Sequence, residues 1–577
     1  MTGRDVTAAF AAALVDEWAR SGVTDAVIAP GSRSAPLSLA LARDGRLRVF
    51  VVVDERSAAF RALGLGLATG RPAVLVCTSG TAAANFHPAV VEAAYARVPL
   101  LVCTADRPPE LRDTGAGQAI DQTRLYGDAP RWFCDPGAPV DEPGSGPTWR
   151  ALACRAFAEA MGPPAGPVHL NLPFREPLLP TGEPYTDAPG RADGQPWTRS
   201  TVGTRAPRPA DVARVAELVR AHPRGLLVAG WGALVTPATA ARFAAAAGWP
   251  VLADPVSQLR CGDSAVSTYE SLLRAPGFAD AHRPDLVVRV GAALTSKVAT
   301  AWLDPEVAQV SVDPDDAWLD PRHAAGERVA VDAEALLGAV AAALGAPPAG
   351  TREWFDDWLR LERDARAAID AVLDAPREPC EGQVARDVAA ALPPGSTLVV
   401  ASSVPVRALE WCMAPREGLR ILANRGANGI DGFVSTVIGV AHGGRGPTVG
   451  LSGDLSFLHD ANGLNGEHRL PDGASATLVV LDNDGGGIFS YLPPSELPEF
   501  EELFATPQHL DLVDVARAHG ANAERIDDAR KLVEVLASPA PSSTGVRVFV
   551  VPLDRHASVA RHREIWDAVA AVVRDRG

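Results

Sequence analysis

Short apolar runs alternate with longer stretches of helical periodicity along the first part of the chain. The runs are rich in Val, Ile and Leu at successive positions, whereas a half-exposed strand would alternate apolar with polar residues. Continuous apolar strands separated by helices are typical of a parallel sheet that is covered on both faces. We therefore predict an α/β domain. Its expected strands are 25–29, 48–53, 73–78, 99–105 and 168–173, and its expected helices include 56–68 and 81–96.

The same alternation returns twice, which divides the chain into three units of similar size. A stretch at 174–208, rich in Pro, Gly, Thr and Asp and without periodicity, is expected to link the first two units. The predicted fold is α/β, with three parallel-sheet domains at 1–185, 186–375 and 376–577. The second unit has expected strands at 224–230, 284–291 and 307–313, a helix at 333–344, a Pro/Gly break at 345–351 and a charged helix at 352–374 that leads onward. The third unit has expected strands at 396–402, 420–424, 448–454, 476–484 and 546–552.

Composition and charge narrow the class of protein. At roughly 150 residues per domain, 577 residues indicate three or four domains. A formal charge of −16 argues against nucleic acid, whose phosphates need a basic surface. No apolar run approaches the ~20 residues of a membrane span, and residues 1–22 are expected to form an amphipathic helix, not a signal peptide. The seven cysteines are scattered and form no C-x-x-C pair, so we expect a reducing cytoplasm and neither a disulfide framework nor a zinc site.

The carboxyl ends of the strands are where chemistry is expected, because ligands of open parallel sheets bind there. In the third unit, Asp454 ends one apolar strand in GLSGD, and Asn483 ends another in VVLDNDGGG. A carboxylate, an amide oxygen and a glycine carbonyl are hard ligands that suit Mg²⁺ or Ca²⁺, and helix N-termini with glycine-rich backbone suit a diphosphate. The alternative is two ordinary turns, because Asp, Asn and Gly are the usual turn residues. The distance between the two loops favours a binding site.

Glu55 is the candidate acid–base group of the first unit. It follows a fully apolar strand, where a dry environment would raise the pKa of its carboxyl and suit it to proton exchange. The alternative is a carboxylate paired with Arg56 or capping the next helix.

Five basic residues also follow strands, namely Arg33, Arg107, Lys297, Arg407 and Arg425. Each one alone is as readily a member of a surface ion pair. Together, in an acidic chain, they indicate a positive pocket for a substrate that carries several carboxylates. Lys297 is one of only two lysines among 54 basic residues, which favours a role that a guanidinium cannot fill.

The two loops of the third unit resemble the signature of thiamine diphosphate enzymes, which is Gly-Asp followed by Asn just under thirty residues later. Here Asp454 and Asn483 are 29 positions apart. The resemblance implies that these two side chains and the carbonyl of Gly485 hold Mg²⁺ (or Mn²⁺), which binds the cofactor's diphosphate. The segment 49–85 looks like the pyrimidine-binding domain of the same enzymes, and this implies that Glu55 protonates the aminopyrimidine ring. The other cofactor contacts implied are Gly429, Ile430, Leu455, Ser456, Gly486, Ile488, Phe489 and Leu492.

Six motifs narrow the resemblance to the 2-succinyl-5-enolpyruvyl-6-hydroxy-3-cyclohexene-1-carboxylate synthase family of the menaquinone pathway. They are PGSRSAPL, TADRP, GAGQAIDQ, LTSKV, SSVPVR and NRGANGIDG, of which the last is the most specific. Gly117, Val298 and Ser402 depart from the family pattern, in which an Asn, a basic residue and an Asn are common at these positions. The departures bear on detailed substrate contacts. The implied active-site residues are Ser32, Arg33, Glu55, Arg107, Gln118, Lys297, Ser403, Arg407, Arg425 and Ile430.

The resemblance implies a transferase reaction. Such an enzyme decarboxylates 2-oxoglutarate and joins the succinyl carbanion to isochorismate in a 1,4-addition, with release of CO2. Ser403 and Arg407 would hold the far carboxylate of 2-oxoglutarate. Isochorismate's carboxylates would meet Arg33, Arg107 and Lys297, and the resemblance assigns Arg425 to neither substrate.

The same resemblance implies how the site is assembled. Ile430 would hold the cofactor in a bent form, and Phe489 and Leu492 would close an apolar wall. The site would lie between the first domain of one subunit and the third domain of another, so a homodimer is the minimum and a homotetramer is expected. The competing hypotheses are another thiamine diphosphate-dependent 2-oxoacid decarboxylase or acetohydroxyacid synthase relative, a catalytically dead scaffold and a non-enzymatic binding protein. The presence of Glu55, Asp454 and Asn483 argues against a dead scaffold.

Overall fold

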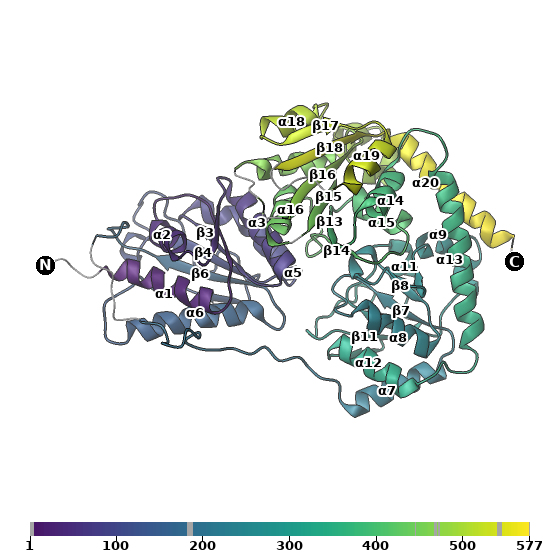
Figure 1. Ribbon diagram of the computed structural model, residues 1–577, viewed down its shortest axis with the longest axis horizontal. Coiled ribbons are helices and arrows are strands. Elements are labelled where there is room, and N and C mark those ends of the chain that lie inside the picture. Colours follow the sequence, from purple (N-terminus) through teal and green to yellow (C-terminus); the bar gives the residue numbers. More distant parts are fainter. Residues whose placement is uncertain are drawn as a thin grey trace.

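The computed structural model contains three α/β units, each built on a six-stranded parallel sheet (Figure 1). It describes residues 5–181, 189–444, 446–466, 470, 473–538 and 545–575. The predicted fold class is therefore confirmed. The predicted boundary at 185/186 lies outside the described residues, and the boundary at 375/376, which falls between two helices, stays a prediction. None of the described helices is long and apolar enough to cross a membrane.

The sheet of the first unit has the strand order β2-β1-β3-β4-β6-β5, and all of its neighbouring strands are parallel. Buried residues of α1, α2 and α6 form the core on one face, and those of α3, α4 and α5 form the core on the other. The strands are β1 (Asp25–Ile28), β2 (Arg48–Val51), β3 (Ala73–Cys77), β4 (Leu100–Asp106), β5 (Trp132–Cys134) and β6 (Pro167–Pro173). The helices are α1 (Val6–Arg20), α2 (Ala35–Asp44), α3 (Glu55–Thr69), α4 (Thr81–Asn85), α5 (His87–Tyr95), η1 (Pro109–Leu111) and α6 (Ser145–Met161).

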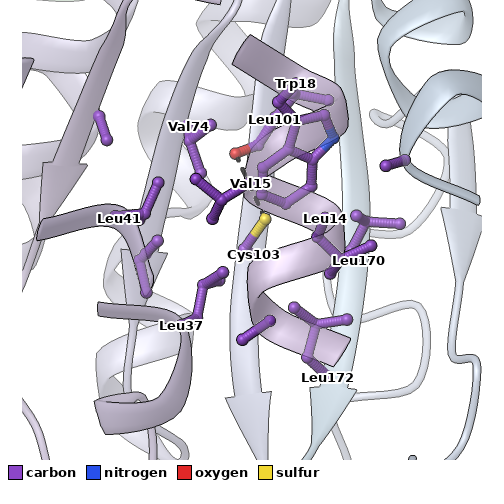
Figure 2. Packing of buried hydrophobic residues seen from close by; sticks show 14 of the residues in the cluster. Leu14, Val15, Trp18, Leu37, Leu41, Val74, Leu101, Cys103, Leu170 and Leu172 are labelled. Carbon is purple, nitrogen blue, oxygen red and sulfur yellow. Dashed lines mark hydrogen bonds between the residues drawn. The ribbon is translucent and has the colours of Figure 1, made fainter. Parts of the chain in front are cut away.

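Helix α1 is the amphipathic helix predicted at the N-terminus. It begins where the side chain of Asp5 accepts a hydrogen bond from the backbone N–H of Ala8, which satisfies one of the free donors of the first turn. Its apolar side points at the sheet, where Leu14 and Trp18 pack against strand residues such as Leu101 (Figure 2). Burial of each such side chain contributes about 1.5–3 kcal/mol.

One predicted helix of the first unit is divided in two. The stretch 81–96 forms α4 and α5, with Phe86 between them. Pro88 has no N–H to donate within a continuous helix, and its ring would meet the carbonyl of the preceding turn. The chain therefore ends one helix and starts the next with Pro88 in its first turn.

The sheet of the second unit has the order β12-β11-β10-β7-β8-β9 and lies between helices on both faces. Its strands are β7 (Gly225–Ala229), β8 (Val251–Ala253), β9 (Ala265–Val266), β10 (Leu286–Val290), β11 (Ala308–Val312) and β12 (Glu327–Val329). The helices are α7 (Pro209–Ala221), α8 (Pro237–Ala247), η2 (Pro255–Ser257), α9 (Tyr269–Arg274), α10 (Phe278–Ala281), α11 (Lys297–Trp302) and α12 (Ala333–Leu344). The described parts of the predicted linker, 174–181 and 189–208, contain no helix or strand, and the linker runs from the first unit to α7 (Figure 1).

The sheet of the third unit repeats the strand order of the first, as β14-β13-β15-β16-β18-β17. Its strands are β13 (Ser396–Val400), β14 (Leu419–Leu422), β15 (Pro447–Gly453), β16 (Ser475–Asp482), β17 (Asn522–Arg525) and β18 (Val546–Pro552). The helices are α13 (Thr351–Leu373), which leads into the unit, then α14 (Glu381–Ala391), α15 (Val404–Cys412), α16 (Phe433–Gly443), α17 (Asp454–His459), η3 (Ala461–Leu464), η4 (Gly487–Tyr491), η5 (Pro493–Glu496), η6 (Glu501–Ala505), α18 (Leu512–Ala518), α19 (Ala529–Ala537) and α20 (Arg555–Arg574).

The first and third units are in contact where two glycines allow helices α3 and α16 to cross closely. Helix α3 crosses α16 so closely that a Cβ on Gly64 would lie 2.3 Å from the carbonyl oxygen of Thr436, and a Cβ on Gly439 would lie 2.2 Å from that of Arg61. No side chain larger than hydrogen fits at either position. On the far side of the third unit, α20 packs along α13, which connects this unit to the second (Figure 1).

Candidate active site

The topology brings the candidate residues to the carboxyl edges of the three sheets. In the first sheet the chain order reverses between β1 and β3, and in the third it reverses between β13 and β15. Crevices form at such points because the connections leave on opposite faces, and ligands bind there. Arg33 follows β1, Ser403 follows β13 and Asp454 follows β15.

Asp454 is a buried carboxylate held by backbone. Its Oδ2 accepts a hydrogen bond from the N–H of Gly485 at 2.6 Å, and its Oδ1 accepts one from the N–H of Leu455 at 2.7 Å. Burial, together with the charges of Asp482 and Asp484, raises the pKa of this carboxyl to about 7, although the two backbone donors oppose the shift. A buried carboxylate beside two more acids is an environment that a cation would stabilise.

Asn483 supplies a second candidate metal ligand, its amide oxygen, beside Asp454. Its Nδ2 donates to Oε1 of Glu381, the buried first residue of α14, at 2.9 Å. The amide orientation is therefore set by its N–H end, while its buried Oδ1 has no hydrogen-bond partner among the described residues. An unpaired buried oxygen is costly, and a metal ion would satisfy it.

The loop after β16 folds back to bring Asp454 and Asn483 together. Gly485 has φ +136°, and a Cβ there would lie 2.3 Å from the carbonyl oxygen of Ala505, so only glycine fits. No cluster of three or more His, Cys, Asp or Glu side chains suited to a metal occurs in the described part of the chain. The predicted set of one carboxylate, one amide oxygen and one backbone carbonyl needs no such cluster, and its donors fit Mg²⁺.

The predicted residues of the first unit lie in the loops that follow β1, β2 and β4. Arg33 is buried and donates to the carbonyl of Phe174 at 2.9 Å, and burial lowers the pKa of its guanidinium, with the charge of Arg107 lowering it further. Arg107 therefore lies near Arg33, and it donates to the carbonyl oxygen of Gly117 at 2.7 Å. Ser32 and Gln118 are exposed.

Glu55 opens α3 and is half-buried. Neither alternative for it is seen, because Asp54 caps the helix and Arg56 donates to the carbonyl of His459 in the third unit. Among the described residues, the carboxylate of Glu55 accepts no hydrogen bond and forms no ion pair. It is thus free to meet a ligand.

Lys297 opens α11 at the edge of the second sheet and is exposed. No described carboxylate lies within ion-pair distance of its ammonium group, whereas Lys531, the other lysine, lies 3.6 Å from Glu524. The backbone in front of Lys297 is fixed, because the N–H of Thr295 donates to buried Asp254 at 2.6 Å.

The third unit supplies two more arginines beside Lys297. Arg425 donates to Oγ1 of Thr295 at 3.3 Å, and Arg407 donates to the carbonyl of Ser403 at 2.7 Å. Burial lowers the pKa of the Arg407 guanidinium, and the charge of Arg425 lowers it further, so the two arginines are close. Ser403 has φ +72°, a conformation that costs free energy outside glycine and is found at functional sites.

The predicted cofactor residues follow the carboxyl ends of β14, β15 and β16. Ser456 donates to the carbonyl of Ile430 at 3.5 Å, which joins α17 to the loop after β14. The side chain of Phe489 packs on Phe504 with ring centroids 5.7 Å apart. Gly429 is exposed, Gly486 is buried, and Ile430, Ile488, Phe489 and Leu492 are half-buried.

The three residues that depart from the family pattern, Gly117, Val298 and Ser402, lie in different local environments. Gly117 uses its carbonyl, not a side chain, to hold Arg107. Val298 packs against the core of the second unit, and Ser402 is buried with an Oγ that has no partner among the described residues.

The predicted residues thus form two groups in one chain. The first group, on the first unit, comprises Ser32, Arg33, Glu55, Arg107 and Gln118. The second group, on the other two units, comprises Lys297, Ser403, Arg407, Arg425 and the cofactor and metal residues. No hydrogen bond or ion pair between described residues joins a side chain of one group to the other.

Sequence reasoning missed the residues that support these groups. Glu381 orients Asn483, and Gln122 accepts from the N–H of Gly80 while donating to Asn171. Glu92 accepts two hydrogen bonds from the loop that carries Arg425. Gln122 lies inside the GAGQAIDQ motif and could have been chosen from it, but Glu92 and Glu381 lie far along the chain from their partners and follow no pattern.

Comparison with known proteins identifies the family to which the chain is similar. Residues 8–125 match the family described as "Thiamine pyrophosphate enzyme, N-terminal TPP binding domain", and residues 191–400 match "Middle domain of thiamine pyrophosphate". Among curated proteins, a 2-succinyl-5-enolpyruvyl-6-hydroxy-3-cyclohexene-1-carboxylate synthase from Thermobifida fusca is 45% identical over 98% of this chain and 99% of its own length. Proteins of the same name from Geobacillus kaustophilus (43% identical, 98% of both chains) and Haloarcula marismortui (40% identical, 99% of both chains) are also similar.

A solved structure has the same fold. Benzoylformate decarboxylase from Polynucleobacter necessarius superposes with a TM-score of 0.70 and covers 95% of this chain and 99% of its own, at 18% identity. At that identity the likeness extends to the arrangement of the three units and not to the substrate.

Proposed function

Because the chain belongs to the 2-succinyl-5-enolpyruvyl-6-hydroxy-3-cyclohexene-1-carboxylate synthase family, we propose that it decarboxylates 2-oxoglutarate and adds the remaining succinyl unit to isochorismate, with thiamine diphosphate as cofactor. The observation that carries the proposal is 40–45% identity to synthases of that name over nearly the whole length of both chains. The geometry agrees, since oxygen ligands for a metal and a cluster of cationic side chains lie at neighbouring sheet edges. The reaction is a step of menaquinone biosynthesis.

Asp454, Asn483 and Gly485 would hold Mg²⁺ (or Mn²⁺) through a carboxylate oxygen, the unpaired amide Oδ1 and a backbone carbonyl. The metal and the glycine-rich loop would hold the diphosphate. When bound, thiamine diphosphate supplies a carbon nucleophile for the keto group and takes up the electron pair that CO2 leaves behind. Glu55 would exchange a proton with the cofactor's pyrimidine ring, a role for which its free carboxylate is suited.

Different cationic residues would bind the carboxylates of the two substrates. Arg407, with Ser403, would bind the far carboxylate of 2-oxoglutarate, because both follow β13 beside the metal ligands. Lys297 approaches the same region from the second unit, and Arg33 and Arg107 would approach from the first, to receive the carboxylates of isochorismate. Burial lowers the pKa of the Arg33 and Arg407 guanidinium groups, and the charges of Arg107 and Arg425, respectively, lower it further. Cations held this close to one another bind anionic substrates strongly.

The separation of the two groups supports a site shared between chains. Glu55 and the arginines of the first unit would complete a site on the third unit of a second copy, so we propose a homodimer at least, with a homotetramer as its expected form. The seven cysteines are free thiols, as suits a protein of the cytoplasm.

Mass spectrometry of the products tests the proposal. The purified protein with Mg²⁺ and thiamine diphosphate should convert 2-oxoglutarate and isochorismate into the named carboxylate and CO2, and omission of the cofactor should abolish the product. Succinic semialdehyde alone, formed equally with and without isochorismate, would instead indicate a simple 2-oxoacid decarboxylase. Pyruvate in place of 2-oxoglutarate tests the acetohydroxyacid synthase alternative.

A further inference from the structure

A carboxylate of the first unit holds a loop of the third unit within the same chain. Glu92, on α5, is 4% exposed, and its two oxygens accept hydrogen bonds from the backbone N–H groups of Gly426 and Ala427, each at 2.7 Å. Paired bonds from consecutive N–H groups to one carboxylate fix both the position and the direction of the backbone.

The other hydrogen bonds of this loop, residues 424–431, come from side chains: Asn424 donates to Thr436, Arg425 donates to Thr295, and Ser456 donates to the carbonyl of Ile430. The loop contains no helix or strand, and within the described structure no other backbone N–H of these eight residues donates a hydrogen bond. Asn428 has φ +62°. A cavity of about 470 Å³, lined by Glu92 and His87 of α5 and by Ala427, Gly429 and Asp431 of the loop, leaves one side of the loop open.

The contact also constrains the sequence of the loop. A Cβ on Gly426 would lie 2.6 Å from the carbonyl oxygen of Glu92 and 2.7 Å from the N atom of Ala96. The loop therefore lies directly against the backbone of α5, and any side chain at 426 would push it away.

We propose that Glu92 is a positioning residue: it fixes the 424–431 loop, and thereby sets where Arg425 meets substrate and where Ile430 meets the cofactor. This inference rests on the proposed function, which places those two residues in the site. Glu92 itself contacts neither ligand. The link also makes the first unit of a chain a support for the cofactor half-site on that chain's own third unit.

The experiment compares Glu92→Gln with a matched control, Glu362→Gln. Glu362, on α13, is also buried and also accepts from two consecutive backbone N–H groups, those of Ser267 and Thr268, at 3.0 and 2.9 Å, but this segment carries none of the site residues. In Glu92→Gln the amide keeps one acceptor and turns an NH2 group toward the second loop N–H. Hydrogen exchange of the cofactor-free protein, thiamine diphosphate affinity by calorimetry, and KM and kcat for 2-oxoglutarate are measured in both.

In Glu92→Gln we expect exchange in the 424–431 peptide to become about tenfold faster or more. Cofactor affinity should fall by about 10- to 100-fold, as for other residues that orient ligating groups, and KM should rise more than kcat falls. Glu362→Gln should lower the melting temperature while leaving loop exchange and cofactor affinity at parental values. Parental loop exchange in Glu92→Gln, or the same loss of cofactor affinity in both variants, would overturn the proposal.

A second variant covers the case in which Glu92→Gln does not fold. Gly426→Ala keeps the carboxylate and displaces the loop, so it should reproduce the faster exchange and weaker cofactor binding; parental values in it would overturn the proposal. Failure of the proposed function is seen separately, as a parent protein that binds no thiamine diphosphate.

Discussion

At the scale of single residues, the environment of Asp454 indicates that the candidate site binds a metal ion. Its carboxylate is buried, and that burial, together with the charges of Asp482 and Asp484, raises its pKa to about 7. A cation bound between Asp454 and the unpaired Oδ1 of Asn483 would remove both penalties at once.

Replacing Asp454 should therefore remove cofactor binding. Asp454→Asn keeps the shape but loses the charge, and we expect thiamine diphosphate affinity at ordinary Mg²⁺ to fall by more than about 100-fold, since ligands matter more than the residues that orient them. Calorimetry measures the affinity, and circular dichroism checks the fold. Asp528→Asn is the control, because that carboxylate caps α19, elsewhere in the third unit, by accepting a hydrogen bond from the N–H of Arg530 at 2.8 Å. Equal affinity in the parent and Asp454→Asn would exclude Asp454 as a metal ligand.

The next prediction concerns Lys297 and the acceptor substrate, isochorismate. It has no described ion-pair partner, so its charge is available to a carboxylate. Lys297→Ala should lose one charged hydrogen bond of roughly 1.5–3 kcal/mol, or about 10- to 150-fold in kcat/KM for isochorismate. Release of CO2 from 2-oxoglutarate in a single turnover should stay near the parental rate.

The second lysine provides the control for that variant. Lys531→Ala removes the same charge from a surface ion pair with Glu524, a kind of pair worth little, and should change neither step. Equal losses in both half-reactions of Lys297→Ala would show that the lysine supports the shared site and not the acceptor alone.

At the scale of elements, the crossing of α3 and α16 makes the junction between the first and third units. Gly64→Ala places a methyl group 2.3 Å from the Thr436 carbonyl and should destabilise the fold by about 1–3 kcal/mol. Gly338→Ala, within α12, meets nothing closer than 3.9 Å and should instead stabilise by about 0.4–1 kcal/mol. Thermal unfolding of the two variants checks the opposite signs; a Gly64→Ala protein as stable as its parent would mean that the two helices can separate freely.

The helices and strands also show how much of the fold could be predicted from the sequence. Long apolar runs predict the central strands, and β15 and β16 begin and end within two residues of their expected bounds. The edge strands β5, β9, β12 and β17 and the short inner strand β8 were missed because two to four residues carry too little periodicity. Pro88 was visible, but its effect, the division between α4 and α5, was not predicted.

The candidate site could be predicted only from residues that follow strand ends. Asp454, Asn483 and the basic residues follow apolar runs, and a strand-end position can be read from a sequence. Glu92 and Glu381 lie on helices and act on loops far along the chain, so only the folded backbone identifies their partners.

At the scale of the whole molecule, the matching strand orders of the first and third sheets place two groups of candidate residues at equivalent sheet edges, and we propose that each group is half of a site. The half-site of the first unit carries Glu55, and that of the third carries Asp454. In a dimer with two-fold symmetry, the first unit of each chain can face the third unit of its partner, which gives two equivalent sites.

This arrangement predicts that two inactive chains restore activity when paired. A hybrid dimer of one Glu55→Gln chain and one Asp454→Asn chain would have one site with both substitutions and one site with neither, because each site takes its first and third units from different chains. We expect the hybrid, co-expressed with two different affinity tags and purified through both, to have about half the parental activity, while each variant alone is nearly inactive. A site completed within one chain would leave one substitution in every site, and the hybrid would then be as inactive as its parts.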